Sequence, residues 1–389
     1  MQATGIVAEY NPFHNGHLHH VQKTKKITQQ PIIAVMSGSF MQRGEPAILS
    51  KWQRATLAVH GGIDLVLELS CCATLRSAQY FASSAVALLA ATGCVSTLSC
   101  GVENPQRDFL AAARLANSEA AQTQLRELLN AGTSYAAAWE KILGEACALN
   151  TPNDILALEY TKALLQTAIK PLYLQREDAG YNSTSLGTRA SATAIRQALA
   201  QGSGSWQAAV PPATRLALAH GTAGYDEKLL WQLICHSLRT LEADEIKSYC
   251  ECSEGLQYVL KAAGKASSLK EAFALCSRKR YTTSRIRRLL MQLLLLTPHI
   301  RTTKAEQSYI RVLAFNDTGR QLLKHMKKTA TLPIITKLPK NILNIYEDVS
   351  INNQLKLEER ATNVWSLLQH DSSLNRPGND YLISPVYVR

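Results

Sequence analysis

The sequence predicts an α/β fold, a doubly wound parallel sheet, followed by a mainly helical and basic segment. Three observations support this prediction. Strand-like and helix-like segments alternate over the first 200 residues, a Gly-Ser-Gly-Ser linker follows at 202–205, and the charge is concentrated after it. Because 389 residues exceed one ordinary core, we expect two domains, 1–200 and 201–389.

Short β-rich apolar runs alternate with helical patterns in the first part of the chain. This βαβα order is typical of a parallel sheet with helices on both of its faces. The expected strands are 4–9, 31–36, 63–69, 95–100 and 171–175, and the expected helices are 17–27, 51–60, 78–92, 110–130, 135–148 and 155–168.

The pattern becomes largely helical after residue 200. Two short β-like runs, 310–315 and 332–335, interrupt it. The expected helices are 212–220, 226–240, 255–264, 284–296 and 355–369.

The net charge of +12 is unevenly distributed. Residues 1–200 hold 16 Lys and Arg against 14 Asp and Glu, whereas residues 201–389 hold 26 against 16. Residues 277–340 alone carry 15 basic residues and only two acidic ones. Such a local excess favours a nucleic-acid-binding face, and an ordinary solvated basic surface is the alternative.

Composition argues against export and membrane insertion. No apolar run reaches the 18–20 or so residues of a membrane span, and the first residues lack the basic region of a signal peptide. The nine cysteines form no CxxC pair, which argues against disulfides and zinc and favours small buried apolar side chains. We therefore expect a cytoplasmic protein.

The chemistry is indicated at the first strand-to-helix turn, residues 9–17. Pro12 ends the strand. Gly16 has no Cβ, so the backbone or an adenine ring can come close to it. His14 and His17 are three apart and lie on one helical turn, where they can donate to ATP phosphates as charge develops on the leaving pyrophosphate. Ordinary surface histidines are one alternative. A metal site is the other, and it needs a third protein ligand that the sequence does not indicate.

This turn, His14-Asn15-Gly16-His17, resembles the H-x-G-H signature of the nucleotidyltransferase superfamily. The partner motif of that superfamily is similar to Ser191-Ala192-Thr193-Ala194-Ile195-Arg196. Ser191 and Thr193 can cap a helix there, and Arg196 can bind phosphate oxygens with its two-pronged guanidinium. The resemblance implies a Rossmann-like nucleotidyltransferase domain in residues 1–200.

The resemblance extends to one family, the bacterial tRNA(Met) cytidine acetate ligases. The N-terminal run GIVAEYNPFHNGHL at 5–18 is similar to theirs, and further matches reach to about residue 362. They include MQRGEPA at 41–47, DLVLEL at 64–69, NDIL at 153–156, RKRYT at 278–282, RIRR at 285–288 and YIRVLAF at 309–315.

The resemblance implies a two-step reaction. Acetate attacks the α-phosphate of ATP to give acetyl-adenylate and pyrophosphate, and N4 of the wobble cytidine of elongator tRNA(Met) then takes the acetyl group, forming N4-acetylcytidine. We expect Mg²⁺ to accompany ATP. An adenylyltransferase for a small phosphorylated metabolite is the alternative, and an RNA-binding protein with a non-catalytic nucleotide fold is a third hypothesis.

The resemblance also implies an ATP site. Its expected catalytic residues are His14, His17 and Arg196. The whole expected set is Val7, Ala8, Glu9, Tyr10, Asn11, Pro12, Phe13, His14, Asn15, Gly16, His17, Leu18, His19, His20, Gly101, Asn153, Arg176, Ser191, Thr193 and Arg196.

Three expectations at this site keep an alternative. Glu9 can hold Mg²⁺ or orient a phosphate ligand, or it is only structural. Asn153 can read adenine or ribose, or it is a plain helix N-cap. The loop 37–46 is a mobile lid that shields a labile adenylate, or a solvated connection.

The basic segment supplies the expected tRNA contacts. In this set Arg285 and Arg288 share a helix face, and Tyr281 can stack on an unpaired base. The alternative is an amphipathic helix that buries Ile286 and Leu289 while its arginines are only solvated. The expected residues are Arg278, Lys279, Arg280, Tyr281, Arg285, Arg287 and Arg288.

Overall fold

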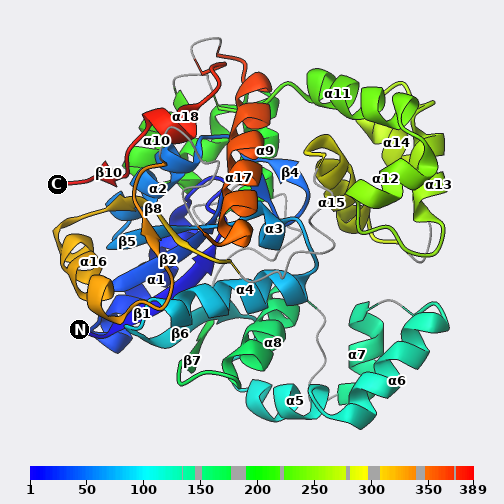
Figure 1. The fold of residues 1–389 in the computed structure, drawn as a ribbon. Coiled ribbons are helices and arrows are strands. Elements are labelled where there is room, and N and C mark those ends of the chain that lie inside the picture. Colours follow the sequence, from blue (N-terminus) through cyan, green and yellow to red (C-terminus); the bar gives the residue numbers. More distant parts are fainter. Residues whose placement is uncertain are drawn as a thin grey trace.

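The computed structural model describes residues 1–133, 135–144, 151–176, 190–219, 223–276, 281–296, 307–338, 347–371 and 374–389. Within these residues, eight strands form one sheet in the order β10-β8-β5-β2-β1-β6-β7, with β9 paired to β8 (Figure 1). Each of the five strands expected before residue 200 is present. The strands are β1 Ala3–Ala8, β2 Ile32–Ser37, β5 Leu65–Leu69, β6 Val95–Val102, β7 Lys170–Gln175, β8 Ile310–Phe315, β9 Ile334–Ile335 and β10 Val386–Tyr387.

The sheet is parallel from β5 to β7 and changes direction at β8. Strand β1 pairs in parallel with β2 and β6, and β8 pairs antiparallel to β5. The sheet therefore continues past the boundary expected at residue 200, because the edge of β5 offers free backbone groups to a later strand. That boundary does not separate the sheet from the rest of the chain.

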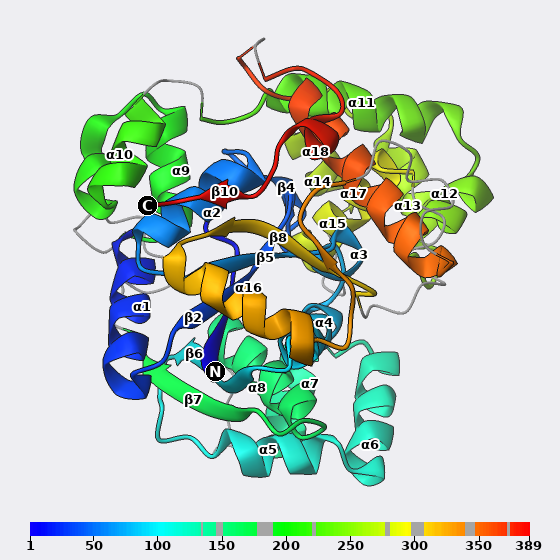
Figure 2. The same ribbon diagram turned by 60° about the vertical axis from the view of Figure 1, so that its left-hand side comes forward.

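Helices cover both faces of the sheet, as a doubly wound fold requires. The side chains of β2 alternate between the faces. Ile33 and Val35 pack with residues of α4 and α8, whereas Ile32 and Ala34 pack with residues of α2 and α9. Figure 2 shows α16 lying across the sheet. The covering helices are α1 Asn15–Thr28, α2 Lys51–His60, α4 Ala78–Ala91, α8 Pro152–Leu164, α9 Ala192–Ala200, α10 Pro212–Ala219 and α16 Asp317–Thr329.

The helix expected over 110–130 is two helices, α5 Phe109–Ala116 and α6 Glu119–Asn130. Ser118 separates them because its hydroxyl accepts from Ala121 N at 3.2 Å and caps α6. The helix α7, Tyr135–Leu143, follows, and the three lie together beside α8 (Figure 1).

The segment between the sheet strands β7 and β8 also builds a separate group of helices, seen on the right of Figure 1. Its core merges with α3, with α17 and with the β3–β4 hairpin, which lies inside the loop expected at 37–46. Phe40 and Met41 of this hairpin are fully buried, so the alternative of a solvated connection is wrong. The elements are α3 Cys71–Thr74, β3 Phe40–Met41, β4 Glu45–Pro46, α11 Glu227–Thr240, α12 Ala243–Tyr249, α13 Leu256–Ala263, α14 Leu269–Cys276, α15 Thr283–Leu294 and α17 Val349–Leu367.

A buried ionic cluster joins the C-terminal segments to the sheet. Lys51 Nζ of α2 lies 2.8 Å from Glu68 Oε1 of β5 and 2.7 Å from Asp380 Oδ1 of α18, Asn379–Leu382. Arg311 Nη2 of β8 lies 3.4 Å from the same Asp380 oxygen. Glu358 Oε1 of α17 accepts from the hydroxyl of Ser70 at 2.7 Å. We call these residues the Lys51 cluster.

Two further expectations concern the cysteines and the possibility of a membrane span. Each of the eight cysteines in the described residues is buried and free of disulfide bonds. No described helix combines the length and the apolar character that crossing a bilayer demands.

Candidate active site

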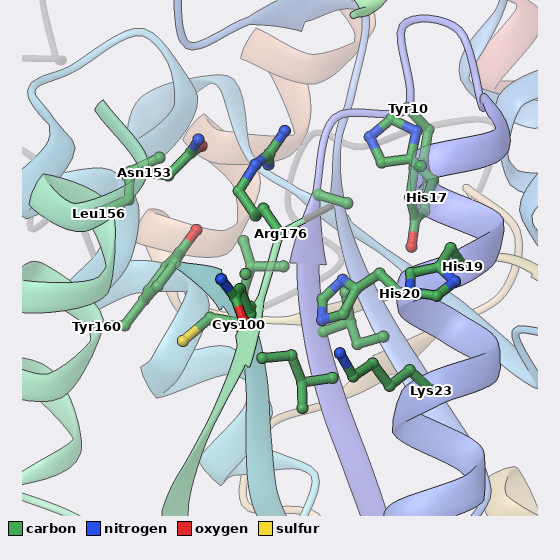
Figure 3. A pocket seen from close by; sticks show the side chains of 17 residues that line it. Tyr10, His17, His19, His20, Lys23, Cys100, Asn153, Leu156, Tyr160 and Arg176 are labelled. Carbon is green, nitrogen blue, oxygen red and sulfur yellow. The ribbon is translucent and has the colours of Figure 1, made fainter. Parts of the chain in front are cut away.

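A cavity of about 150 Å³ opens where β1, β6 and β7 end (Figure 3). From β1 the chain moves to β2 on one side, and β6 lies on the other, so this is the switch point at which open α/β sheets bind ligands. Ten of the expected ATP-site residues line it, namely Val7, Ala8, Tyr10, Gly16, His17, His19, His20, Gly101, Asn153 and Arg176.

His14 is the N-cap of α1. Its Nδ1 accepts hydrogen bonds from Gly16 N at 3.1 Å and from His17 N at 3.4 Å. Burial, with Arg176 and Arg196 nearby, lowers the pKa of His14 to about 3, so the ring is neutral at neutral pH. In a neutral imidazole whose Nδ1 accepts, the proton is on Nε2, and that N–H remains to donate to a ligand.

His17 completes a capping box with the same logic. Its Nδ1 accepts from His14 N at 3.3 Å, which also puts the proton on Nε2. The two rings stack with their centroids 3.6 Å apart. Burial is the main cause that lowers the pKa of His17 well below its ordinary value. The turn therefore presents two fixed, neutral N–H donors, which suits phosphate oxygens at the start of a helix.

Arg196 reaches this turn from α9. Its Nη1 donates to Asn11 O at 2.8 Å, and its Nη2 lies 2.5 Å from Glu45 Oε1 of the hairpin. Ser191 is the N-cap of α9, accepting from Ala194 N at 3.1 Å, whereas Thr193 lies in the first turn and is not the cap. The expected partner motif and the histidine turn are thus brought together.

Glu9 directly follows β1 and faces the hairpin. Its Oε1 accepts from Gln42 N at 2.6 Å and from the Ser37 hydroxyl at 3.4 Å. Burial raises the pKa of Glu9, opposed by the Gln42 N–H and by Arg43. Glu9 therefore holds the hairpin against the turn, whatever else it does.

The other expected residues of the turn act on the protein itself. Asn11 Oδ1 accepts from Ile48 N at 2.9 Å, and Asn15 Nδ2 donates to Ala208 O at 2.9 Å. Phe13 is fully buried, and Leu18 packs at the edge of the same core. Together with Pro12 they shape the turn and do not line the cavity.

The opposite wall is arranged by Glu103, which the sequence-based set did not contain. Glu103 Oε1 accepts from Asn153 Nδ2 at 3.1 Å and lies 3.7 Å from Arg176 Nε. A Cβ on Gly101 would lie 3.1 Å from Arg176 Cγ, so the glycine gives that side chain room. The N-cap of α8 is Thr151, so the alternative role of Asn153 as a plain cap is wrong.

Helical spacing reveals further residues that sequence analysis missed. Lys23 follows His19 by one turn of α1, and it lines the cavity. Leu156 follows Asn153 by three residues and Tyr160 follows Leu156 by four, so the three share a face of α8 and form the wall across from α1 (Figure 3). Cys100 also lines the cavity, but burial raises the pKa of its thiol to about 12, which argues against a nucleophile.

The basic helix α15 lies behind the hairpin. Arg288 Nη1 donates to Gln42 O at 3.4 Å, and Arg287 Nη1 lies 3.5 Å from Glu45 Oε2. Arg285 is partly exposed and donates to the Ser253 hydroxyl at 2.7 Å. Three expected tRNA contacts, Arg278, Lys279 and Arg280, lie outside the described residues.

Tyr281 does not present its ring to solvent. Its side chain is buried, and its hydroxyl lies 3.1 Å from Glu254 Oε2. The Arg285 guanidinium lies 5.2 Å from the ring centroid. The sequence suggested that a base stacks on Tyr281, but the ring has no exposed face on which a base could stack.

In the described part of the chain, no three side chains of His, Cys, Asp or Glu gather closely enough to hold a metal ion. The donors that line the cavity include the imidazole of His17, the ammonium of Lys23 and the guanidinium of Arg176, which suit an anion such as a polyphosphate.

Comparison with known proteins agrees with this geometry. The family model HIGH Nucleotidyl Transferase matches residues 1–380. A tRNA(Met) cytidine acetate ligase of Leuconostoc mesenteroides is 37% identical, covering 100% of this chain and 99% of its own, and one of Halothermothrix orenii is 35% identical over 99% of both.

Solved structures agree as well. Thermotoga maritima TmcAL, in its apo form, is 30% identical with a TM-score of 0.92, and its form bound with alpha-thio ATP has a TM-score of 0.89. Both cover 100% of each chain. This chain therefore belongs to the tRNA(Met) cytidine acetate ligase family of HIGH nucleotidyl transferases.

Proposed function

We propose that this chain uses ATP to activate acetate and transfers the acetyl group to N4 of the wobble cytidine of elongator tRNA(Met). The main structural support is one arrangement. Two neutral imidazoles with free Nε2–H groups, His14 and His17, lie beside Arg196 at the switch point of the sheet. The full-length similarity to tRNA(Met) cytidine acetate ligases supports the choice of substrates.

In the first step, an acetate oxygen attacks the α-phosphorus of ATP, and the bond from that phosphorus to pyrophosphate breaks. His14 and His17 donate their Nε2–H groups to oxygens that gain negative charge, and Arg176 and Arg196 balance this charge. The donors are already fixed by the capping box, so they need little reorganisation. Removing one such donor typically slows a reaction by about 10²–10³.

Mg²⁺ is proposed to enter with ATP. Mg²⁺ is usually held by one or two carboxylates, substrate phosphates and water. Glu9 is the carboxylate of the turn that fits this role. Its two hydrogen bonds within the described part of the chain both use Oε1, so Oε2 is the oxygen that would meet a cation.

In the second step, the N4 amine attacks the acetyl carbon, AMP leaves, and the amine loses a proton. No covalent enzyme intermediate is required, so the residues position the two substrates. We propose that the helical group bearing Arg285, Arg287 and Arg288 binds the tRNA, while residues 1–200 hold ATP. Tyr281 is left out of this surface because it is buried.

Mass analysis of tRNA(Met) after incubation with the protein, ATP and acetate tests the proposal. The expected product carries one acetyl group on one cytidine, and omission of ATP or acetate abolishes it. Unmodified tRNA in the complete reaction would overturn the proposal. Acetate-dependent release of pyrophosphate without tRNA separates it from the alternative, a metabolite adenylyltransferase, which requires no acetate.

A further inference from the structure

A second cavity, of about 130 Å³, lies between the β3–β4 hairpin and the helices α11, α14 and α15. Its walls include Glu45 of the hairpin, Tyr225 before α11, Phe273 of α14 and Arg287 of α15. The mechanism above gives this cavity no role, although Glu45 in its wall also binds Arg196.

Flat side chains line this cavity. The Arg287 guanidinium carbon lies 4.8 Å from the centroid of the Phe273 ring, and Tyr225 contributes a second ring. Unpaired bases of RNA stack on aromatic rings and on guanidinium planes. The cavity therefore offers the surface that a base leaving its stack requires.

Two polar side chains in the wall of this cavity, Glu45 and Arg287, can form further hydrogen bonds. Arg287 Nη1 lies 3.5 Å from Glu45 Oε2, which is longer than an ordinary hydrogen bond. Arg287 Nε is buried and has no hydrogen-bond partner among the described residues. A carboxylate that accepts from the N4 amine is a typical contact for cytosine. A guanidinium N–H can donate to the ring nitrogen N3 or to O2. Uracil presents a carbonyl oxygen where cytosine has its amine, so it repels the carboxylate.

The same carboxylate links this cavity to the ATP side. Glu45 Oε1 accepts from Arg196 Nη2 at 2.5 Å, and Arg196 Nη1 donates to Asn11 O in the histidine turn. An amine that contacts Glu45 Oε2 therefore shares the Glu45 carboxylate with Arg196, the arginine proposed to bind the phosphates.

Close packing fixes the hairpin in this place. Gly44 has φ +73°, and a Cβ there would lie 2.4 Å from the backbone of Arg287. The hairpin thus lies directly against α15, and Glu45 cannot move far from Arg287 without moving that helix.

We propose that this cavity receives the cytosine base of the tRNA, stacked on the Arg287 guanidinium that the Phe273 ring supports from its other face, with Glu45 accepting from N4. The inference rests on the proposed function, because that function supplies a cytidine that must leave its stack. It adds the place where the base is held and the residue that distinguishes cytidine from uridine.

The first test compares Phe273→Ala with Leu275→Ala, a control on the same helix whose side chain is 51% exposed. Loss of the ring that supports the stacked guanidinium is expected to weaken tRNA binding by about tenfold or more in Phe273→Ala. The control is expected to bind normally. ATP–pyrophosphate exchange without tRNA reports whether each variant is folded. If Phe273→Ala loses exchange, Phe273→Leu decides, since it keeps the volume without the ring.

Normal tRNA affinity in a folded Phe273 variant would overturn the base cavity. The proposed function fails separately, if the unmodified protein never acetylates tRNA(Met). The two failures are therefore distinguishable in one set of reactions.

The second test concerns Glu45 and measures binding without ATP. The protein is titrated with tRNA(Met) that carries cytidine or uridine at the acceptor position. We expect a preference for cytidine that falls toward one in Glu45→Gln, because an amide can donate to the uridine carbonyl. An unchanged preference in Glu45→Gln would overturn the role of Glu45.

Discussion

The histidine turn and the Lys51 cluster both bury titratable side chains, but they satisfy them in opposite ways. In the turn, His14 and His17 use one ring nitrogen each for the backbone of their own helix. In the cluster, Lys51 lies between the carboxylates of Glu68 and Asp380, with every side chain almost fully buried. Among the described residues, the turn leaves its ring Nε2–H groups without a protein partner, whereas the cluster pairs its charges with one another.

This difference shows that a displaced pKa alone does not identify a functional site. Burial lowers the pKa of His14 to about 3, and burial with the nearby charge of Glu68 raises the pKa of Glu358 to about 8. Both are large changes, as catalytic and structural networks each produce. What distinguishes the turn is the cavity beside it and the two ring N–H donors that have no partner among the described residues.

The largest expected effect is on stability, from Lys51→Met. Removing one partner of a buried ion pair leaves uncompensated carboxylates, at a typical cost of about 3–5 kcal/mol. Lys25→Met is the matched control, because Lys25 pairs with Asp64 at 3.1 Å but its side chain is 39% exposed. It is expected to lose at most about 1 kcal/mol. Urea unfolding measures both, and equal losses would contradict the comparison.

The second prediction breaks the turn without breaking its cap. Asn caps helices well, and Gln is suited to the third position of a capping box, but neither supplies an imidazole Nε2–H. His14→Asn and His17→Gln are therefore expected to fold normally and to slow acetate-dependent ATP–pyrophosphate exchange by about 10²-fold or more. The exposed His236 of α11 provides the control, His236→Asn. Near-normal exchange in both turn variants would refute their role.

Sequence patterns predicted the part of the fold that local signals determine. The strands β1 and β2 and the helix α2 were expected from local patterns, and the structure shows that Ser50 caps α2. The sequence did not predict that β8 would pair antiparallel with β5, because such pairing depends on segments far apart. It also missed α16, where few side chains such as Leu322 and Met326 are buried in a mostly polar helix.

The site shows the same division. The motifs indicated His14, His17 and Arg196 because each of the two motifs, residues 14–17 and 191–196, is a short run of the sequence. Glu45 and Glu103 could not be found in this way, because each acts on residues distant in the sequence. Glu45 contacts Arg196, 151 positions further along the chain. Only the folded chain shows which carboxylate meets which arginine.

The third prediction concerns pH and the Lys51 cluster. Because the folded pKa of Glu358 is raised to about 8 from 4.5, the folded state keeps a proton that the unfolded state has lost. Between pH 6.5 and 8 the free energy of unfolding should therefore fall as pH rises, by at most about 1.4 kcal/mol per pH unit. Below pH 6.5, His14 and His17 contribute with the opposite sign, since their folded pKa values are lowered.

Glu358→Gln removes this titration. Urea unfolding of the variant over the same pH range should give a flatter profile than that of the unmodified protein. Parallel profiles would show that Glu358 does not take up a proton on folding.

The smallest expected effect is on the exposed side of α15. Charges there are solvated, whereas the titratable side chains of the histidine turn and the Lys51 cluster are buried. Arg285→Gln is expected to weaken tRNA binding a few-fold and to reduce the slope of log affinity against log salt by about 0.7–0.9. Its ATP affinity should be unchanged, because Arg285 contacts Ser253 and not the turn. Arg288 is unsuitable for this test, since burial and Arg285 lower its pKa to about 10 and it supports the hairpin.

Arg320→Gln on α16 is the matched control, because its side chain is 68% exposed and its ion pair, with Asp317, is local. Both variants remove one exposed positive charge from the chain, so general attraction for tRNA falls equally in the two. A phosphate contact at Arg285 predicts a change of slope in that variant alone. The same change in both would mean that α15 contributes charge without contact, and that the tRNA surface lies elsewhere.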